Sequence, residues 1–177
     1  LVIQLAEPAP LDIKTESGDV TILDSGSGAK VVCLSGNVTL RGVNGNIDIS
    51  SQSGDVKVSE TSTPMASIES KSGAVVLEKV DGNVNLRVAS GDVTMKDCKG
   101  KTISVESVSG NVHADFDSPI SGNVNIRTVN GDASIHVPDG CDCRVSLSTL
   151  RGDVNCEIEL DDQAKSDQRI TGRLRNG

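Results

Sequence analysis

Hydrophobic and polar residues alternate in short stretches along this chain, and each stretch begins just after a glycine. The second and fourth residues after the glycine are mostly apolar, whereas the third and fifth are mostly polar. A period of two is typical of a β-strand that buries one face and exposes the other. The apolar pairs are Val20/Ile22, Val38/Leu40, Val56/Val58, Val75/Leu77, Val93/Met95, Val112/Ala114, Ala133/Ile135 and Val154/Cys156. We therefore predict a short strand after each of these glycines.

A four-residue motif marks where these strands begin. Six copies read Ser-Gly, then Asp, Asn or Ala, then Val: Ser17–Val20, Ser35–Val38, Ser53–Val56, Ser72–Val75, Ser90–Val93 and Ser109–Val112. Two looser copies follow at Asn130–Ala133 and Arg151–Val154. The glycines of these motifs, hereafter the corner glycines, are 18 to 21 residues apart. A fixed period of this length indicates structural repeats that must stack on one another to bury their apolar faces.

A second turn falls near the middle of most repeats, because Gly45, Gly82, Gly100 and Gly140 each lie nine residues after a corner glycine. The alternation then resumes in a second strand, with apolar pairs Ile47/Ile49, Val84/Leu86, Ile103/Val105, Val124/Ile126 and Val145/Leu147. Stacked repeats pair equivalent strands in parallel, and parallel crossovers are almost always right-handed. The sequence therefore predicts an all-β fold, a right-handed parallel β-helix (β-solenoid) of about eight coils of 18–21 residues with two main strands per coil.

The two ends of the chain depart from the repeat. Residues 1–16 carry apolar residues around two prolines and are predicted to form a capping partial coil. The repeats themselves cover residues 17–159. Residues 160–177 lose the pattern and are mostly polar, so we expect a C-terminal cap followed by a polar tail. Both ends need caps because a solenoid otherwise exposes a sheet edge.

Asp or Asn follows the corner glycine in seven of the eight motifs. This corner column consists of Asp19, Asn37, Asp55, Ala74, Asp92, Asn111, Asp132 and Asp153. Stacked oxygens could bind Ca²⁺, but calcium-binding solenoid repeats have a denser Gly-Gly-x-Gly-x-Asp pattern. Asp and Asn also suit turns and accept hydrogen bonds from nearby backbone amides. We interpret the column as turn chemistry and predict no metal site.

Composition narrows the function classes. Phe116 is the one aromatic residue, and the formal net charge is −8. We expect no nucleic-acid binding, because no basic run stands out and no aromatics are available to stack on bases. No apolar stretch approaches the length of a membrane span. Five unevenly spaced cysteines do not resemble a secreted disulfide framework. We therefore expect free thiols and an intracellular, reducing compartment such as the cytosol or mitochondrion, with the cell surface as the alternative.

Two columns of outward side chains are the candidate binding face. The third residue after each corner glycine gives Thr21, Thr39, Lys57, Val76, Thr94, His113, Ser134 and Asn155. The fifth gives Leu23, Arg41, Ser59, Glu78, Lys96, Asp115, His136 and Glu157, whose later members alternate in charge if His136 is protonated. Neighbours in a column face each other across paired strands, which predicts salt bridges between them. Within these two columns we predict the following binding positions: Thr21, Thr39, Lys57, Thr94, Lys96, His113, Asp115, Ser134, His136 and Glu157.

Catalytic and cofactor chemistry find little support in the sequence. The two histidines, His113 and His136, fall on outward positions in adjacent coils and are interpreted as surface residues. The spacing of Cys141 and Cys143 matches no standard zinc motif. No phosphate-binding loop or nucleophile elbow occurs. We expect no catalytic residues and no cofactor.

The recurring Ser-Gly-Asp-Val-x-Ile/Val pattern resembles the adhesin-like β-helix (β-solenoid) domain family, whose function is unknown. The resemblance spans about residues 11–158 and implies the solenoid fold, without catalytic residues to transfer. The five cysteines make the chain look more like the family's eukaryotic intracellular relatives than its bacterial surface members.

Three hypotheses about function remain open. The first is a non-catalytic binding or scaffold module with a protein partner of unknown identity, since solenoids offer long rigid faces. The second is a cell-surface adhesin-like protein. The third is a polysaccharide-acting β-helix enzyme, for which the only expanded corners are near Phe116–Ile120 and Val137–Cys143. An oligomer joined end to end or through sheet edges is a further expectation.

Overall fold

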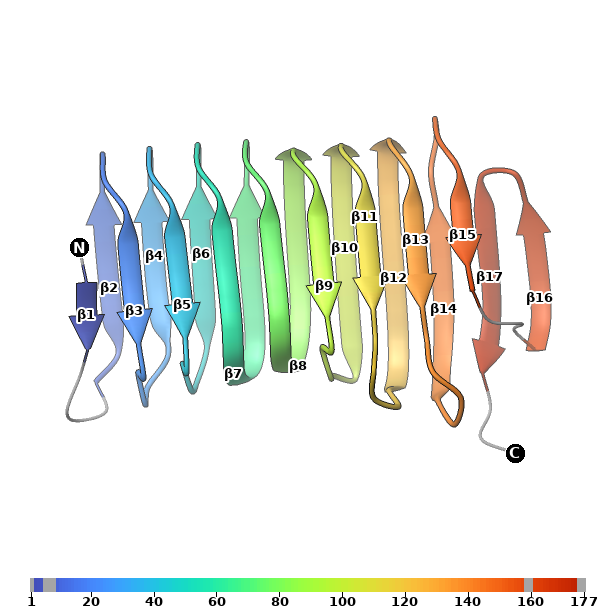
Figure 1. The fold of residues 1–177 in the computed structure, drawn as a ribbon, viewed down its shortest axis with the longest axis horizontal. Coiled ribbons are helices and arrows are strands. Elements are labelled where there is room, and N and C mark those ends of the chain that lie inside the picture. The colour runs from blue at the N-terminus through green and yellow to red at the C-terminus, as the bar shows by residue number, and fades with distance from the viewer. Residues whose placement is uncertain (1, 5–8, 158–160, 175–177) are drawn as a thin grey trace.

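The computed structural model describes residues 2–4, 9–157 and 161–174. The described residues are all-β, and none of them forms a helix that could cross a membrane. The chain winds into a β-solenoid of about eight turns, as the sequence predicts. As the chain advances from left to right in Figure 1, its front strands run downward and its rear strands upward, so the winding is right-handed.

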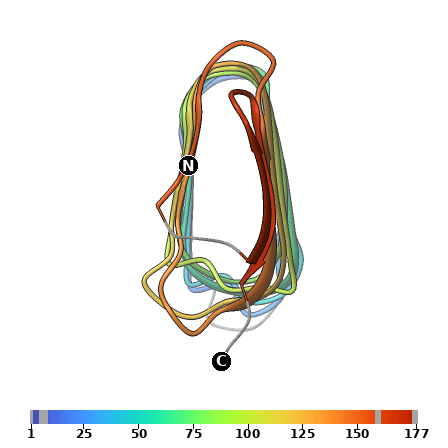
Figure 2. The same ribbon diagram turned by 90° about the vertical axis from the view of Figure 1, so that its right-hand side faces the viewer.

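Each coil contributes one strand to each of two faces. The first face contains the strands that follow the corner glycines: β1 (Val2–Gln4), β3 (Val20–Leu23), β5 (Val38–Arg41), the beginnings of β7 (Val56–Ser70) and β8 (Val75–Ser90), β9 (Val93–Lys96), β11 (Val112–Asp115), β13 (Ala133–His136) and β15 (Val154–Cys156). The second face contains β2 (Leu11–Thr15), β4 (Ala29–Cys33), β6 (Ile47–Ser51), the ends of β7 and β8, β10 (Thr102–Ser109), β12 (Ser121–Asn130) and β14 (Asp142–Ser148). Viewed along the rod, the coils superpose as a narrow, flattened outline (Figure 2).

The predicted register between coils is confirmed. Val20 pairs with Val38, and Val38 with Val56, all in parallel. On the second face Ile103 pairs with Val84 on one side and with Val124 on the other. Because each inward residue stacks on its equivalent in the next coil, the core is a continuous column of small aliphatic side chains between the two faces.

The corner glycines are required by backbone stacking as well as by conformation. Gly91 has a φ of 135°, a region that residues with a Cβ rarely adopt. A Cβ added to Gly91 would collide with the carbonyl oxygen of Gly73, the corner glycine one coil earlier. Gly18 also has positive φ, 109°, but a Cβ there would meet nothing within 4 Å. At Gly91, inside the rod, both the positive φ and the close backbone contact exclude a side chain. At Gly18, the first corner, only the positive φ disfavours one.

The corner column links successive coils through side-chain to backbone hydrogen bonds. The backbone N–H of Asn37 donates to Oδ1 of Asp19 at 2.8 Å, and the N–H of Asp55 donates to Oδ1 of Asn37 at 2.9 Å. The same bond recurs at Asp55–Ala74, Asp92–Asn111, Asn111–Asp132 and Asp132–Asp153. These contacts confirm the interpretation of the column as turn chemistry. Only Ala74 interrupts the series, since it has no oxygen to offer the N–H of Asp92.

Substituting Ala74→Asn should complete this hydrogen-bonded column. The new amide oxygen would accept from the N–H of Asp92, and one such bond contributes about 1 kcal/mol of stability. Urea unfolding followed by circular dichroism would measure the gain. The matched variant Asn111→Ala removes an existing bond and should cost about the same amount. Equal stability of all three proteins would show that the bonds contribute nothing.

The C-terminal segment folds back across the end of the rod. Strand β17 (Arg169–Leu174) pairs antiparallel with β14, and β16 (Asp161–Ser166) pairs antiparallel with β17. Ile170 is fully buried against the core. The hairpin therefore extends the second face by two strands of alternating direction, and Figure 1 shows it at the C-terminal end.

Candidate binding groove on the second face

The first predicted column lies on the first face with its members side by side. Thr39 pairs with Thr21 and with Lys57, and His113 pairs with Thr94 and with Ser134. The Nδ1 atom of His113 lies 2.8 Å from the hydroxyl of Ser134. The column is thus a continuous surface row, and the contact between His113 and Ser134 joins two of its own members.

The second predicted column is also continuous, but its salt bridges differ from the expected ladder. Lys96 is aligned with Glu78 and with Asp115, yet Glu78 forms its ion pair with Lys57, at 3.0 Å. His136 does pair with Glu157, with Nδ1 3.0 Å from Oε2. The predicted register between strands is correct, but the ion-pair partners are not the aligned residues. The long, flexible side chain of Lys57 reaches diagonally across to Glu78 on the neighbouring strand.

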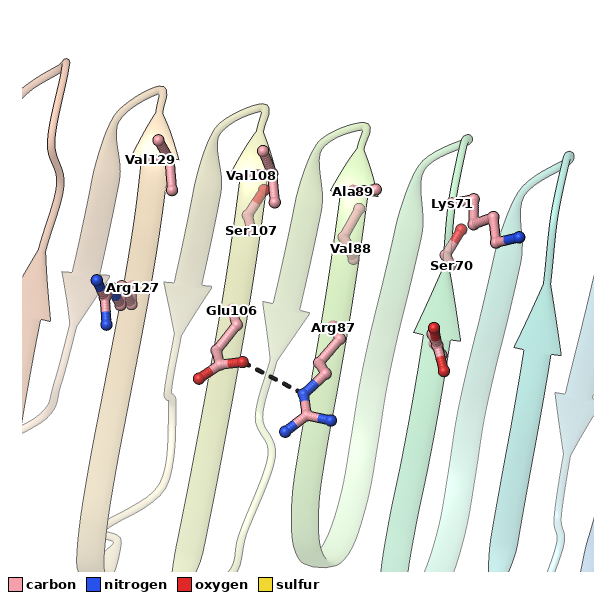
Figure 3. Close-up of a pocket in the computed structure, with 11 residues that line it drawn as sticks. Ser70, Lys71, Arg87, Val88, Ala89, Glu106, Ser107, Val108, Arg127 and Val129 are labelled. Atoms are coloured by element: carbon pink, nitrogen blue, oxygen red, sulfur yellow. Dashed lines mark hydrogen bonds and ion pairs between the residues drawn. The ribbon is translucent and has the colours of Figure 1, made fainter.

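A groove lies on the opposite, second face, and two rows of side chains border it (Figure 3). The first, which we term the charge row, consists of Glu69, Arg87, Glu106 and Arg127, each aligned with the next across paired strands. The second, the apolar row, consists of Ala89, Val108, Val129 and Leu150 and runs along the edge of the face next to the corners. Both rows run along the rod, across the strands.

The apolar row is unusual for a surface. Val108 is 52% exposed and Leu150 is 62% exposed. Among the described residues, five large hydrophobic side chains are exposed, and three of them, Leu34, Val108 and Leu150, occupy the position two residues before a corner glycine. Single exposed hydrophobic side chains are normal on a protein surface, whereas large contiguous apolar patches are typical of interaction sites.

Beneath the groove lie buried residues that alternate along each strand with the outward residues of the two rows. Ser70, Val88 and Ser107 line a space of about 320 Å³ between the two rows. The hydroxyls of Ser70 and Ser107 are buried without a hydrogen-bond partner among the described residues. In the next coil Thr128 donates from its hydroxyl to the carbonyl of Gly110 at 3.4 Å. The groove is therefore the space between two outward rows, above strand residues whose side chains face the core.

The charge row alternates in sign along the rod. Arg87 Nε lies 3.2 Å from Glu106 Oε2, and both side chains are more than half exposed. An exposed pair of this kind contributes at most about 1 kcal/mol to folding. Within the described part of the chain, Glu69 and Arg127 at the two ends of the row form no ion pair. The row thus presents an unneutralised negative charge at one end and an unneutralised positive charge at the other.

The cysteines offer little reactive chemistry. All five are free thiols, as the sequence predicts. Burial raises the pKa of Cys98 to about 11. Burial first, and then the neighbouring Cys141, raises the pKa of Cys143 to about 12. Since the thiolate is the nucleophile, both residues are poor nucleophiles at neutral pH. Cys156, expected to be buried, is partly exposed at the last coil.

The sequence carries a signal for the groove that the first-face columns do not contain. Positions counted forward from the corner glycines fall on the first face only. Counting backward places Glu69, Arg87, Glu106 and Arg127 four residues before a corner glycine, and Ala89, Val108, Val129 and Leu150 two residues before one. Backward counting keeps the second strand in register because coil-length differences arise in the middle of the coil.

Residues 7–177 match the model of the Toastrack DUF4097 family. No curated protein and no solved structure matches the chain. The family match covers the solenoid from β2 onward and the C-terminal hairpin. It agrees with the expected β-solenoid family of unknown function and carries no ligand or catalytic residue. The chain therefore belongs to the Toastrack DUF4097 family.

Proposed function

We propose that this chain is a non-catalytic scaffold that binds a protein surface through the groove of its second face. The observation that supports the proposal most directly is the contiguous apolar row, Ala89 to Leu150, beside an alternating charge row. A hydrophobic patch with a charged, solvent-accessible border is the usual composition of a protein–protein interface. The groove offers this composition on a rigid sheet.

The magnitudes favour protein binding over a small ligand. Each fully covered Val or Leu side chain contributes roughly 1.5–3 kcal/mol of hydrophobic free energy, and association costs several kcal/mol before any net affinity appears. Several side chains of the row must therefore be covered together. Only a partner that extends along the rod over several coils can do so.

The first face is a weaker candidate for this role. Its charged side chains are largely engaged with one another, as in the pairs Arg41–Glu60 and Lys57–Glu78. A partner would have to break or share these contacts. The second face instead presents Val108 and Leu150 uncovered, so covering them costs no existing interaction.

Site-specific photo-crosslinking tests the proposal. A p-benzoylphenylalanine at position 108, introduced into the full-length protein in its native cell, should give a discrete crosslinked species. The same residue at position 113, equally outward but on the first face, is the matched control and should give none. Leu150→Asp should abolish the crosslink from position 108 by placing a charge on the apolar row, while Thr94→Asp on the first face should not. Crosslinking from position 113 alone would contradict the assignment.

A further inference from the structure

The occupant of the groove can be named from the spacing of its rows. Side chains of both rows repeat once per strand, roughly every 4.8 Å along the rod. An extended peptide repeats its side chains on one face about every 6.8 Å. Its side chains would therefore fall out of register with the two rows within a few coils. A second stack of β-strands has the same repeat. Figure 1 shows that successive strands on each face remain nearly aligned, with little twist, so two such stacks can stay matched over several coils.

The order of charges identifies the second stack. From the N-terminal side the charge row reads negative, positive, negative, positive: Glu69, Arg87, Glu106, Arg127. Reversing the order of the row inverts every sign. A copy laid face to face with its rod antiparallel therefore meets opposite charge at all four positions. A parallel copy in the same register would set each charge against its like.

We infer that the groove binds a second copy of this chain in an antiparallel, two-fold symmetric dimer, an inference that rests on the function proposed for the groove. The two-fold axis passes between the coils of Arg87 and Glu106. Arg87 then faces Glu106 of the second copy, and Glu69 faces Arg127 of the second copy, each contact occurring twice. Such mutual contacts characterise isologous interfaces, the commonest kind among homodimers.

The neighbouring rows are compatible with this arrangement. In the apolar row, Ala89 faces Val108 of the second copy, and the aliphatic stem of Lys71 covers Val129, as lysine stems commonly do. A row of small uncharged residues runs beside the charge row, on the side away from the apolar row: Ser67, Asn85, Ser104 and Asn125. Beyond the two ends of the charge row, Ser50 would face Ser148 of the second copy, and Val32 would face Arg169 of the second copy. No like charges meet within these three rows.

Glu69 and Arg127 provide a decisive test because they are not neighbours within one chain. Three strand spacings, roughly 14 Å, separate them, so they contact each other only across the dimer. The single variants Glu69→Arg and Arg127→Glu should each weaken self-association on the order of a hundredfold, since each sets two like-charge pairs in the interface. Circular dichroism should show both variants folded.

Mixing the two single variants should restore a dimer. A Glu69→Arg chain carries two positive end charges and an Arg127→Glu chain carries two negative ones, so only the mixed pair is complementary. The double variant Glu69→Arg/Arg127→Glu should again form homodimers. Lys96→Glu, an equal charge reversal on the first face, is the control and should leave association unchanged. Light scattering coupled to size exclusion and sedimentation equilibrium would measure all five proteins and the mixture.

The outcomes separate this inference from the function on which it rests. A monomeric wild-type protein, or a mixture of the single variants that stays monomeric, would overturn the dimer. If position 108 still crosslinks to a different protein, the groove remains a binding site and only the identity of its occupant is wrong. If position 108 crosslinks to nothing and the chain is a monomer, both proposals fail.

Discussion

Gly91→Ala should destabilise the rod by about 4 kcal/mol or more, among the largest effects of a single substitution, whereas Gly18→Ala should cost only about 1–2 kcal/mol. Both glycines have positive φ, 135° and 109° respectively, so both alanines are conformationally strained. Only at Gly91 does the added Cβ also collide with backbone, the carbonyl of Gly73. That carbonyl is fixed by the stacking of two coils and has no side-chain rotation with which to move away.

Thermal unfolding followed by circular dichroism measures both variants. For a chain of this length, about 4 kcal/mol corresponds to a fall in Tm of roughly 8–16 °C. Because coils contact only their neighbours, hydrogen exchange should localise the damage of Gly91→Ala to the coils on either side of residue 91. A Gly18→Ala variant as unstable as Gly91→Ala would show that conformation alone, and not crowding between corners, requires these glycines.

Phe116→Ala should have the second largest effect, a loss of about 3–5 kcal/mol. Phe116 is the one aromatic residue of the chain and is fully buried. It lies just after β11, at one of the expanded corners, where its backbone N–H donates to the carbonyl of His136 at 3.1 Å. The other buried residues of the two expanded corners, Ile120, Val137, Cys141 and Cys143, are smaller. None of them can fill the volume that the ring would vacate.

The matched variant Phe116→Leu keeps an apolar side chain and should cost about 1.5 kcal/mol. Urea unfolding of the two variants gives the difference. Hydrogen exchange should show lost protection in residues 113–120 and 133–141 of the alanine variant, with the first three coils unchanged. Equal stability of Phe116→Ala and the wild type would mean that the corner can collapse around the deletion.

The success of sequence-based prediction here follows from the repeat. Once Val20, Val38 and Val56 are recognised as equivalents, parallel stacking leaves one register, and the inward and outward positions of every coil follow from the alternation. The order of the first-face columns could therefore be predicted residue by residue. The same logic identified the oxygens of Asp19 and Asn37 as acceptors for backbone amides.

The repeat could not predict features that depend on individual side-chain conformations or that have no equivalent in other coils. Glu78 has a neighbour on the column and another on the diagonal, and the choice of Lys57 depends on side-chain conformations that periodicity does not contain. The hairpin of β16 and β17 has no equivalent coil, so its antiparallel return to β14 had no precedent in the repeat. The two rows of the groove are found only by counting back from the following corner glycine. Glu106 and Val108 lie at a constant spacing before that glycine, whereas their spacing from the preceding corner varies between coils.

The reversed direction of β17 has a consequence for how long such a rod can grow. Parallel stacking has no intrinsic end, since each coil offers the next an edge like the one it used itself. An antiparallel strand offers a different hydrogen-bond pattern, so another coil of the same kind finds no matching template beyond β14 on the second face. The exposed charged residues Asp161 and Lys165 on the outermost strand discourage further pairing. Filament formation at the C-terminal end of the second face is thereby opposed by strand polarity, and the hairpin acts as a length stop.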